Sequence, residues 1–171
     1  MSGWRNRITG SGTLLVDDAL FHDLNWRIHT KEQQAVMEAV LDQVGWVQQI
    51  IISTNSGKLL DGHLRVTLAD RRGEKELPCV FVDVTPAEER LILASLDPIG
   101  AMAVPDREKL SDLLEGIDRE DATIDALARA VAEECDVPSD GPMPQSDETP
   151  HPTRAVTCPE CGHVFDASAG G

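Results

Sequence analysis

The stretch Leu59-Leu60-Asp61-Gly62-His63-Leu64-Arg65 decides the fold, because an apolar run ends in it and a helical pattern begins. Its spacing predicts a strand that stops at Leu60, a turn at Asp61-Gly62 and a helix over 62–72. Such a turn directs backbone N–H groups, an imidazole and a guanidinium towards one point. An anion such as phosphate is what a point of this kind binds best.

Each residue of the turn has a chemical reason to be there. Gly62 permits a tight turn and lets a ligand approach the backbone closely, because it has no Cβ. His63 and Arg65 lie in the first helical turn, where the helix dipole favours an anion. Asp61 is a candidate to cap the helix or to bind a metal or a hydroxyl. The ordinary alternative is that Asp61 is an N-cap, His63 a surface residue and Arg65 an ion-pair partner, since short anion-site motifs have many false positives.

Around this stretch the pattern alternates between strands and helices. Strands are expected at 13–16, 49–53, 58–60 and 77–84, and residues 1–12 read as a loop. Helices are expected at 30–44, 62–72, 86–96, 106–115 and 121–134, with N-caps at Thr30 and Thr85. Asp97-Pro98-Ile99-Gly100 is expected to break the third of them. Several strands lie too close along the chain for parallel crossovers, so the pattern predicts a mixed α+β domain over residues 1–134.

A second candidate site precedes the first predicted long helix, in Asn25-Trp26-Arg27-Ile28-His29. An Arg and a His two residues apart, beside a Trp, are suited to stack on a base or to bind phosphate. The alternative is a loop packed by Trp26 and Ile28 with exposed polar neighbours.

Composition limits the functions that the chain can have. It has 171 residues, of which 41% are hydrophobic, enough for one core and a tail. No run approaches the length of a membrane span, and the N-terminus lacks the apolar region of a signal peptide. The four cysteines are too few for a disulfide framework, so we expect a cytoplasmic protein with no membrane partner.

The net charge of −15 is unevenly distributed. Residues 1–75 carry nine Lys or Arg and nine Asp or Glu, whereas residues 76–171 carry six and twenty-one. Affinity for the DNA backbone comes mainly from Lys and Arg, so the C-terminal half is unsuited to non-specific DNA binding. A solvated acidic surface is its simplest interpretation.

The C-terminal part falls into two segments. Residues 135–156 contain five prolines among Ser, Asp and Gly, a composition typical of a disordered linker. Residues 157–171 hold Cys158-Pro159-Glu160-Cys161-Gly162-His163, which has the form of half a zinc knuckle. Cys158, Cys161 and His163 are the candidate zinc ligands. His151, Cys135 or a second chain are candidates to complete the site, and an incomplete, metal-free knuckle is the alternative.

The order of these motifs resembles the ParB N-terminal domain, of the ParB/sulfiredoxin superfamily. The resemblance covers about residues 8–115. It is carried by Asn25-x-Arg27-x-His29, Gln33-Gln34, Gly45, Ile50-Ile51-Ile52, Asp61-Gly62-His63-x-Arg65, Ala69, Gly73, Pro78 and Val82-Asp83. The segment 96–103 and the knuckle are similar to those of a subgroup found beside DNA-modification methylases, often on phages and other mobile elements.

The resemblance implies a small mixed sheet with packed helices and a nucleotide- or DNA-associated role. It assigns phosphate binding to Gly62, His63 and Arg65, with Arg27 and His29 contributing. Partition proteins of the family bind and hydrolyse CTP with Mg²⁺, and some relatives are described as nucleases. In this chain Asp97 takes the place of the family's metal-binding Glu, but the Asn and Arg that accompany that Glu are missing. His63 stands where sulfiredoxins carry their catalytic Cys, which argues against sulfiredoxin chemistry.

Three functions therefore compete. The first is a binding module for a nucleotide or DNA, which serves a DNA-modification, partition or phage system and has a DNA methyltransferase as a candidate partner. The second is a metal-dependent nuclease or nucleotidase, with Asp61 and Asp97 on the metal and His63 as base. The third is a non-catalytic regulatory or scaffold protein. A homodimer is compatible with each.

Overall fold

The computed structural model describes residues 3–137, 155–157 and 164–166. The chain divides into two units, Met1–Ser139 and Asp140–Gly171. In the second unit, the described strands β5 (Ala155–Thr157) and β6 (Val164–Asp166) pair antiparallel. In the first unit the elements are β1 (Ile8–Leu15), a 3-10 turn (Val16–Asp18), α1 (Lys31–Val44), β2 (Ile50–Ser53), β3 (Leu59–Asp61), α2 (His63–Arg72), β4 (Glu76–Val82), α3 (Pro86–Ala101), α4 (Arg107–Glu115) and α5 (Ala122–Glu134).

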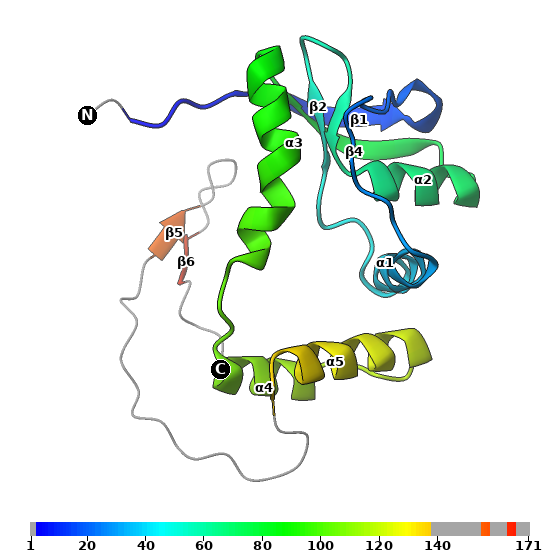
Figure 1. The fold of residues 1–171 in the computed structure, drawn as a ribbon, viewed down its shortest axis with the longest axis vertical. Coiled ribbons are helices and arrows are strands. Elements are labelled where there is room, and N and C mark those ends of the chain that lie inside the picture. The colour runs from blue at the N-terminus through cyan, green and yellow to red at the C-terminus, as the bar shows by residue number, and fades with distance from the viewer. Residues whose placement is uncertain (1–2, 138–154, 158–163, 167–171) are drawn as a thin grey trace. The chain divides into compact units, whose positions relative to one another are not determined.

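The first unit is built on a four-stranded sheet with the order β1-β4-β2-β3. β2 and β4 are parallel and are connected through β3 and α2, whereas the pairs β1–β4 and β2–β3 are antiparallel. The sheet is therefore mixed, and the predicted α+β class is confirmed (Figure 1).

Helices cover both faces of this sheet, as the alternation along its strands requires. From β2, Ile50 and Ile52 enter a core cluster with Val66 and Ala69 of α2. The residue between them, Ile51, packs on the opposite face with Leu93 of α3. α1 contacts α2, and Figure 1 shows α3 on the other side of the strands. The turn from β3 to α2 thus lies at the edge of a core that is closed on both faces.

Two of the predicted elements were wrong in their bounds. β1 begins at Ile8 and not at Thr13, because its pairing with β4 runs from Ile8↔Val82 to Leu15↔Glu76. α3 continues past the expected break to Ala101, with Pro98 inside it. Pro98 has no N–H to donate to the carbonyl of Ala94, and its ring crowds that carbonyl, but the helix continues to Ala101.

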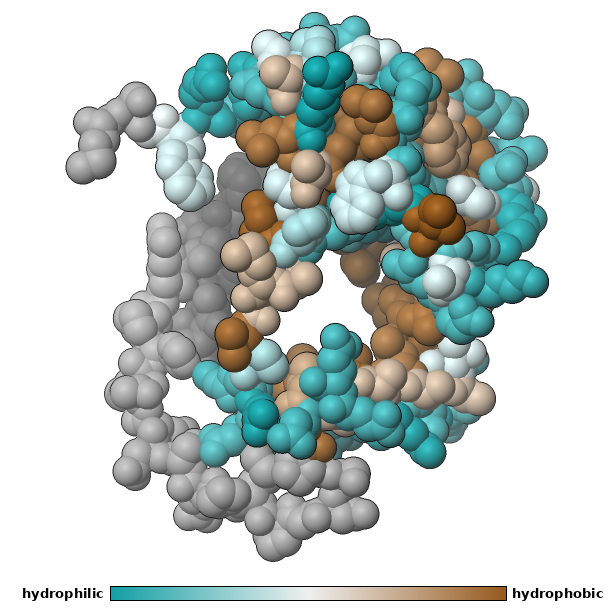
Figure 2. Space-filling model, in the orientation of Figure 1, coloured by the Kyte–Doolittle hydropathy of each residue, from teal (hydrophilic) through white to brown (hydrophobic). Residues whose placement is uncertain are grey.

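The last two helices of the first unit, α4 and α5, contact each other, and α5 also contacts α1. Asp106 and Asp121 cap them, as each carboxylate accepts backbone N–H groups of the first turn. Figure 2 shows mostly hydrophilic side chains on the visible surface of these helices. None of the helices in the part of the chain that the structure describes has the length and apolar character needed to span a bilayer.

Candidate phosphate-binding site

The turn between β3 and α2 is formed by Gly62. Its φ of 92° lies in the left-handed region, and it takes the N-cap position of α2 that Asp61 was expected to hold as an alternative. A Cβ at Gly62 would lie 2.5 Å from Cγ2 of Ile50, so only glycine fits here without a shift of the strand. Val66 N–H donates to the carbonyl of Gly62, which makes it the first N–H with a partner inside the helix. The N–H groups of residues 63–65 therefore have no acceptor within α2.

A cavity of about 250 Å³ lies in front of this turn. Both stretches singled out from the sequence line it, together with Asp97 from α3. The lining residues are Arg27, His29, Gln33, Met37, Asp61, Gly62, His63, Leu64, Arg65 and Asp97. Residues more than thirty positions apart in sequence therefore share one cavity.

His63 is buried, so the expectation of a surface residue was wrong. The residue is 5% exposed, and its ring lies 5.6 Å from the ring of Phe21, tilted by 52°. Among the described residues its Nε2 has no hydrogen-bond partner. Burial lowers the pKa of His63 below the ordinary value, against the opposing effect of Asp61. His63 is thus a largely neutral imidazole beside the cavity, and its Nε2 is able to make a further hydrogen bond.

Arg65 lies on the cavity wall with two partners. Its Nη1 lies 3.3 Å from Oδ2 of Asp61, and its Nη2 donates to Oε1 of Gln48. Both charged side chains are mostly buried, at 11% and 18% exposure. Asp61 therefore orients the guanidinium, and the ion-pair expectation for Arg65 is confirmed.

Arg27 reaches the same cavity from the loop before α1. Its Nε lies 2.5 Å from Oδ2 of Asp97, and its Nη2 donates to the carbonyl of Leu93 at 3.3 Å. The guanidinium carbon also lies 5.2 Å from the centroid of the Trp26 ring. The Arg27 side chain is 12% exposed, whereas Trp26 and Ile28 are 61% and 93% exposed. The alternative of a loop packed by Trp26 and Ile28 is wrong, because both of these residues are exposed and the Arg27 side chain between them is mostly buried.

His29 contributes to the cavity wall from the N-terminal end of α1. Its Nδ1 lies 3.0 Å from Oε1 of Gln33, which is four residues on. Thr30 caps the helix as predicted, since its hydroxyl accepts the N–H of Gln33 at 3.1 Å. Gln33 was not predicted to line the cavity, and its contact with His29 joins the start of α1 to the loop before it.

The cavity is a weak candidate for a metal. Asp61 and Asp97 both line it, but each carboxylate already faces an arginine. No group of three His, Cys, Asp or Glu residues suited to a metal ion occurs among the described residues. The magnesium role predicted for Asp97 therefore stays a prediction. Cys158, Cys161 and His163 lie outside the residues that the structure describes, and with them the zinc prediction.

A larger hollow of about 470 Å³ lies elsewhere, between α1 and the segment before α5. Carboxylates dominate its wall, from Glu38, Asp42, Asp118, Glu120 and Asp121. It would repel a phosphate, so the smaller cavity at Gly62 is the better anion site despite its size.

No protein-family model and no curated protein matches the sequence. Solved structures similar to it include two of a pNOB8-like ParB N-domain. The one in the C2221 form has 18% identity and a TM-score of 0.45, over 76% of this chain and 51% of that chain. The other has 17% identity and a TM-score of 0.45, over 78% and 48%.

A third similar structure is the C-terminally truncated chromosome-partitioning protein ParB from Caulobacter crescentus, complexed with CTP-γ-S. It has 18% identity and a TM-score of 0.46, over 73% of this chain and 63% of that chain. The chain thus spans between about half and just under two thirds of the length of these three solved chains. These likenesses concern the path of the backbone, and the chemistry of the cavity rests on its own residues.

Proposed function

We propose that the chain is a nucleotide- or DNA-associated module that binds a phosphate group in the cavity at Gly62. The observation that carries this proposal is that two arginines, Arg27 and Arg65, line the same cavity as the start of α2. The N–H groups of residues 63–65 there have no acceptor within the helix. Arginine presents paired N–H donors that match phosphate oxygens, and a helix N-terminus adds a favourable field.

The size and charge of the cavity suit a phosphate group better than a whole nucleotide. Sites that enclose drug-sized ligands occupy about 300–1,000 Å³, and this cavity is smaller, at about 250 Å³. One or two phosphate groups would fill it, with the nucleoside or the rest of a DNA strand outside. Asp61 and Asp97 face the two guanidinium groups, and a phosphate would compete with these carboxylates for the arginines.

The resemblance of the sequence motifs to the ParB N-terminal domain suggests that the chain acts in a DNA-modification, partition or phage system. A metal-dependent nuclease or nucleotidase is the second candidate, because Asp61, His63 and Asp97 line the same cavity. In that function His63 would act as the base, as a neutral imidazole is able to do.

A titration of the four nucleoside triphosphates, with and without Mg²⁺, tests the proposal. We expect Arg65→Ala and Arg27→Ala each to weaken binding by about tenfold or more, the loss of one charge-assisted contact. Arg129→Ala is the matched control, because this arginine pairs with Asp125 on α5, away from the cavity. Release of inorganic phosphate, or cleavage of a labelled DNA, would favour the enzyme. If the wild-type chain binds neither a nucleotide nor a 5′-phosphorylated oligonucleotide, the proposal is wrong.

A further inference from the structure

His22 and Glu89 form a buried pair outside the proposed phosphate site. Their side chains are 8% and 5% exposed, and Nε2 of His22 lies 3.4 Å from Oε2 of Glu89. Burial by itself raises the pKa of Glu89, but the hydroxyls of Ser53 and Ser56 and the ring of His22 together lower it below its ordinary value. Glu89 is therefore a buried carboxylate that stays charged, and such a group is costly unless it holds a partner.

The hydrogen bonds of His22 define the tautomer of its ring. Nδ1 accepts the backbone N–H of Leu24 at 3.0 Å, so it carries no proton itself. The proton of the neutral ring is then on Nε2, which donates to Glu89. One nitrogen holds the local turn at residues 22–25, where Asn25 N–H also donates to the carbonyl of His22. The other nitrogen connects that turn to α3.

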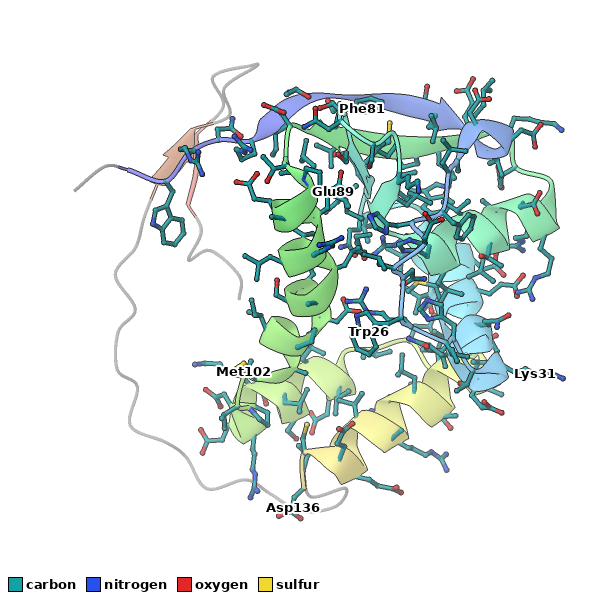
Figure 3. All side chains as sticks on the ribbon, turned by 45° about the horizontal axis from the view of Figure 1, so that its top comes forward. Trp26, Lys31, Phe81, Glu89, Met102 and Asp136 are labelled. Atoms are coloured by element: carbon teal, nitrogen blue, oxygen red, sulfur yellow. The ribbon has the colours of Figure 1, made fainter. Side chains whose placement is uncertain are left out.

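Glu89 belongs to a row of contacts along one face of α3. Glu89, Leu93 and Asp97 are spaced by four residues, and such positions lie above one another on a helix. The Leu93 carbonyl accepts the indole N–H of Trp26 at 3.1 Å as well as Arg27, and Asp97 pairs with Arg27. Figure 3 shows Glu89 and Trp26 on the same side of α3. Residues 22–27 therefore run beside α3 and contact it at both ends, through His22 at one end and Arg27 at the other.

We propose that His22 is a positioning residue for the phosphate site. Its Nε2–H bond to Glu89 sets the place of the loop along α3, so that Arg27 and His29 reach the cavity. This inference rests on the proposed function. Other contacts hold the start of the loop, namely Leu59 N–H to the carbonyl of Leu20 at 2.8 Å and the exposed pair of Lys58 with Asp23. They fasten it to β3 and not to α3, so they do not replace the contact with Glu89.

Two substitutions of His22 separate its two nitrogens. His22→Asn keeps an oxygen near the place of Nδ1 for the Leu24 N–H but cannot reach Glu89. His22→Gln reaches Glu89 with an amide N–H but loses the acceptor for Leu24. With inorganic pyrophosphate as the probe, we expect about tenfold weaker binding for His22→Asn and less than about threefold for His22→Gln. Binding is measured well below the melting temperature of each variant, so that lost stability is not read as lost affinity.

A second measurement needs no ligand. We expect the indole N–H of Trp26 to exchange with solvent about tenfold faster in His22→Asn than in the wild type, and to be little changed in His22→Gln. Asp23→Asn, which removes the exposed ion pair of the same loop, is the control and should leave both readouts unchanged.

Three results would overturn the inference. The first is a folded His22→Asn variant that binds the probe as tightly as the wild type. The second is an equal loss of affinity in His22→Asn and His22→Gln, which would mean that His22 acts only through the local turn. The third is a wild-type chain that binds no pyrophosphate; the proposed function fails as well only if the chain also binds neither a nucleotide nor a 5′-phosphorylated oligonucleotide. Faster indole exchange in His22→Asn would then still show the contact between the loop and α3, which distinguishes the two failures.

Discussion

Gly62 holds the backbone conformation on which the cavity depends. Gly62→Ala would place a Cβ in a left-handed residue and against Ile50, so we expect a loss of about 2–4 kcal/mol in the free energy of unfolding. Gly73→Ala is the matched control, because Gly73 has a φ of 74° but nothing within 4 Å of the position that a Cβ would take. It should cost only about 1 kcal/mol of backbone strain. Urea unfolding measures both, and equal losses would contradict the clash with Ile50.

His63 should make the stability of the fold depend on pH. Because burial lowers its pKa in the folded chain, the unfolded chain binds a proton more readily. The stability is fully present above the ordinary imidazole pKa of about 6.5 and is lost as the pH falls below that value. Comparing urea midpoints of the wild type and His63→Gln above and below this pH isolates the effect. A wild-type slope no steeper than that of the variant would show that His63 titrates normally.

Individual site residues were predictable to the extent that their chemistry is local. Gly62 and Arg65 were predicted correctly as members of the cavity, because both follow from the spacing of one strand-to-helix turn. Whether His63 or Arg27 is buried depends on Phe21 and on α3, which no local pattern encodes. The pair of His22 and Glu89 went unnoticed for the same reason, since 67 residues separate them along the chain.

Among the described helices, α3 alone begins with a complete capping box. Thr85 accepts the N–H of Glu88 at 3.3 Å, and the carboxylate of Glu88 accepts the N–H of Thr85 at 2.8 Å. Arg7 adds an ion pair to that carboxylate at 2.7 Å. These reciprocal contacts begin the helix whose later turns hold the loop of Arg27.

Thr85→Ala should therefore cost more than the loss of a simple cap. We expect about 1–2 kcal/mol, against about 1 kcal/mol or less for Thr30→Ala, because α1 lacks the reciprocal capping box of α3 and has no fully buried residue. Thermal melts of the two variants under one buffer provide the comparison. A larger loss for Thr30→Ala would mean that α1 contributes more to stability than its burial indicates.

The ends of helices were predicted well where a capping residue or a glycine marks them in the sequence. The ends of strands were predicted poorly where pairing with a distant strand determines them. Thr30, Gly45 and Gly73 placed the ends of α1 and α2 correctly. Residues 8–12 of β1, with Gly10 and Gly12, have little strand propensity of their own and form a strand because β4 lies beside them. Pro98 suggested an end to α3, but the helix continues through exposed residues to Ala101.

For the whole molecule, the predicted boundary after α5 leads to a truncation experiment. A chain that ends at residue 137 keeps every described element of the first unit. We expect its melting temperature to stay within about 3 °C of the full chain, since every core residue among the described residues 3–137 is kept. A larger drop would place the C-terminal segment in the folding unit.

The same truncation tests the predicted knuckle. If Cys158 and Cys161 bind zinc, the purified full chain should carry zinc and the chain ending at residue 137 should not. Elemental analysis of both chains after dialysis against EDTA-free buffer measures this. Equal zinc contents would place any bound metal elsewhere.

The position of β1 also has a consequence for how the chain folds during synthesis. β1 is an edge strand that pairs with β4, the partner of Ile8 being Val82. This strand must wait, unpaired, until more than sixty further residues have left the ribosome and the β2–α2–β4 crossover has formed. We expect the N-terminal strand to dock last, and to be the first part of the sheet that a protease reaches in a partly folded chain.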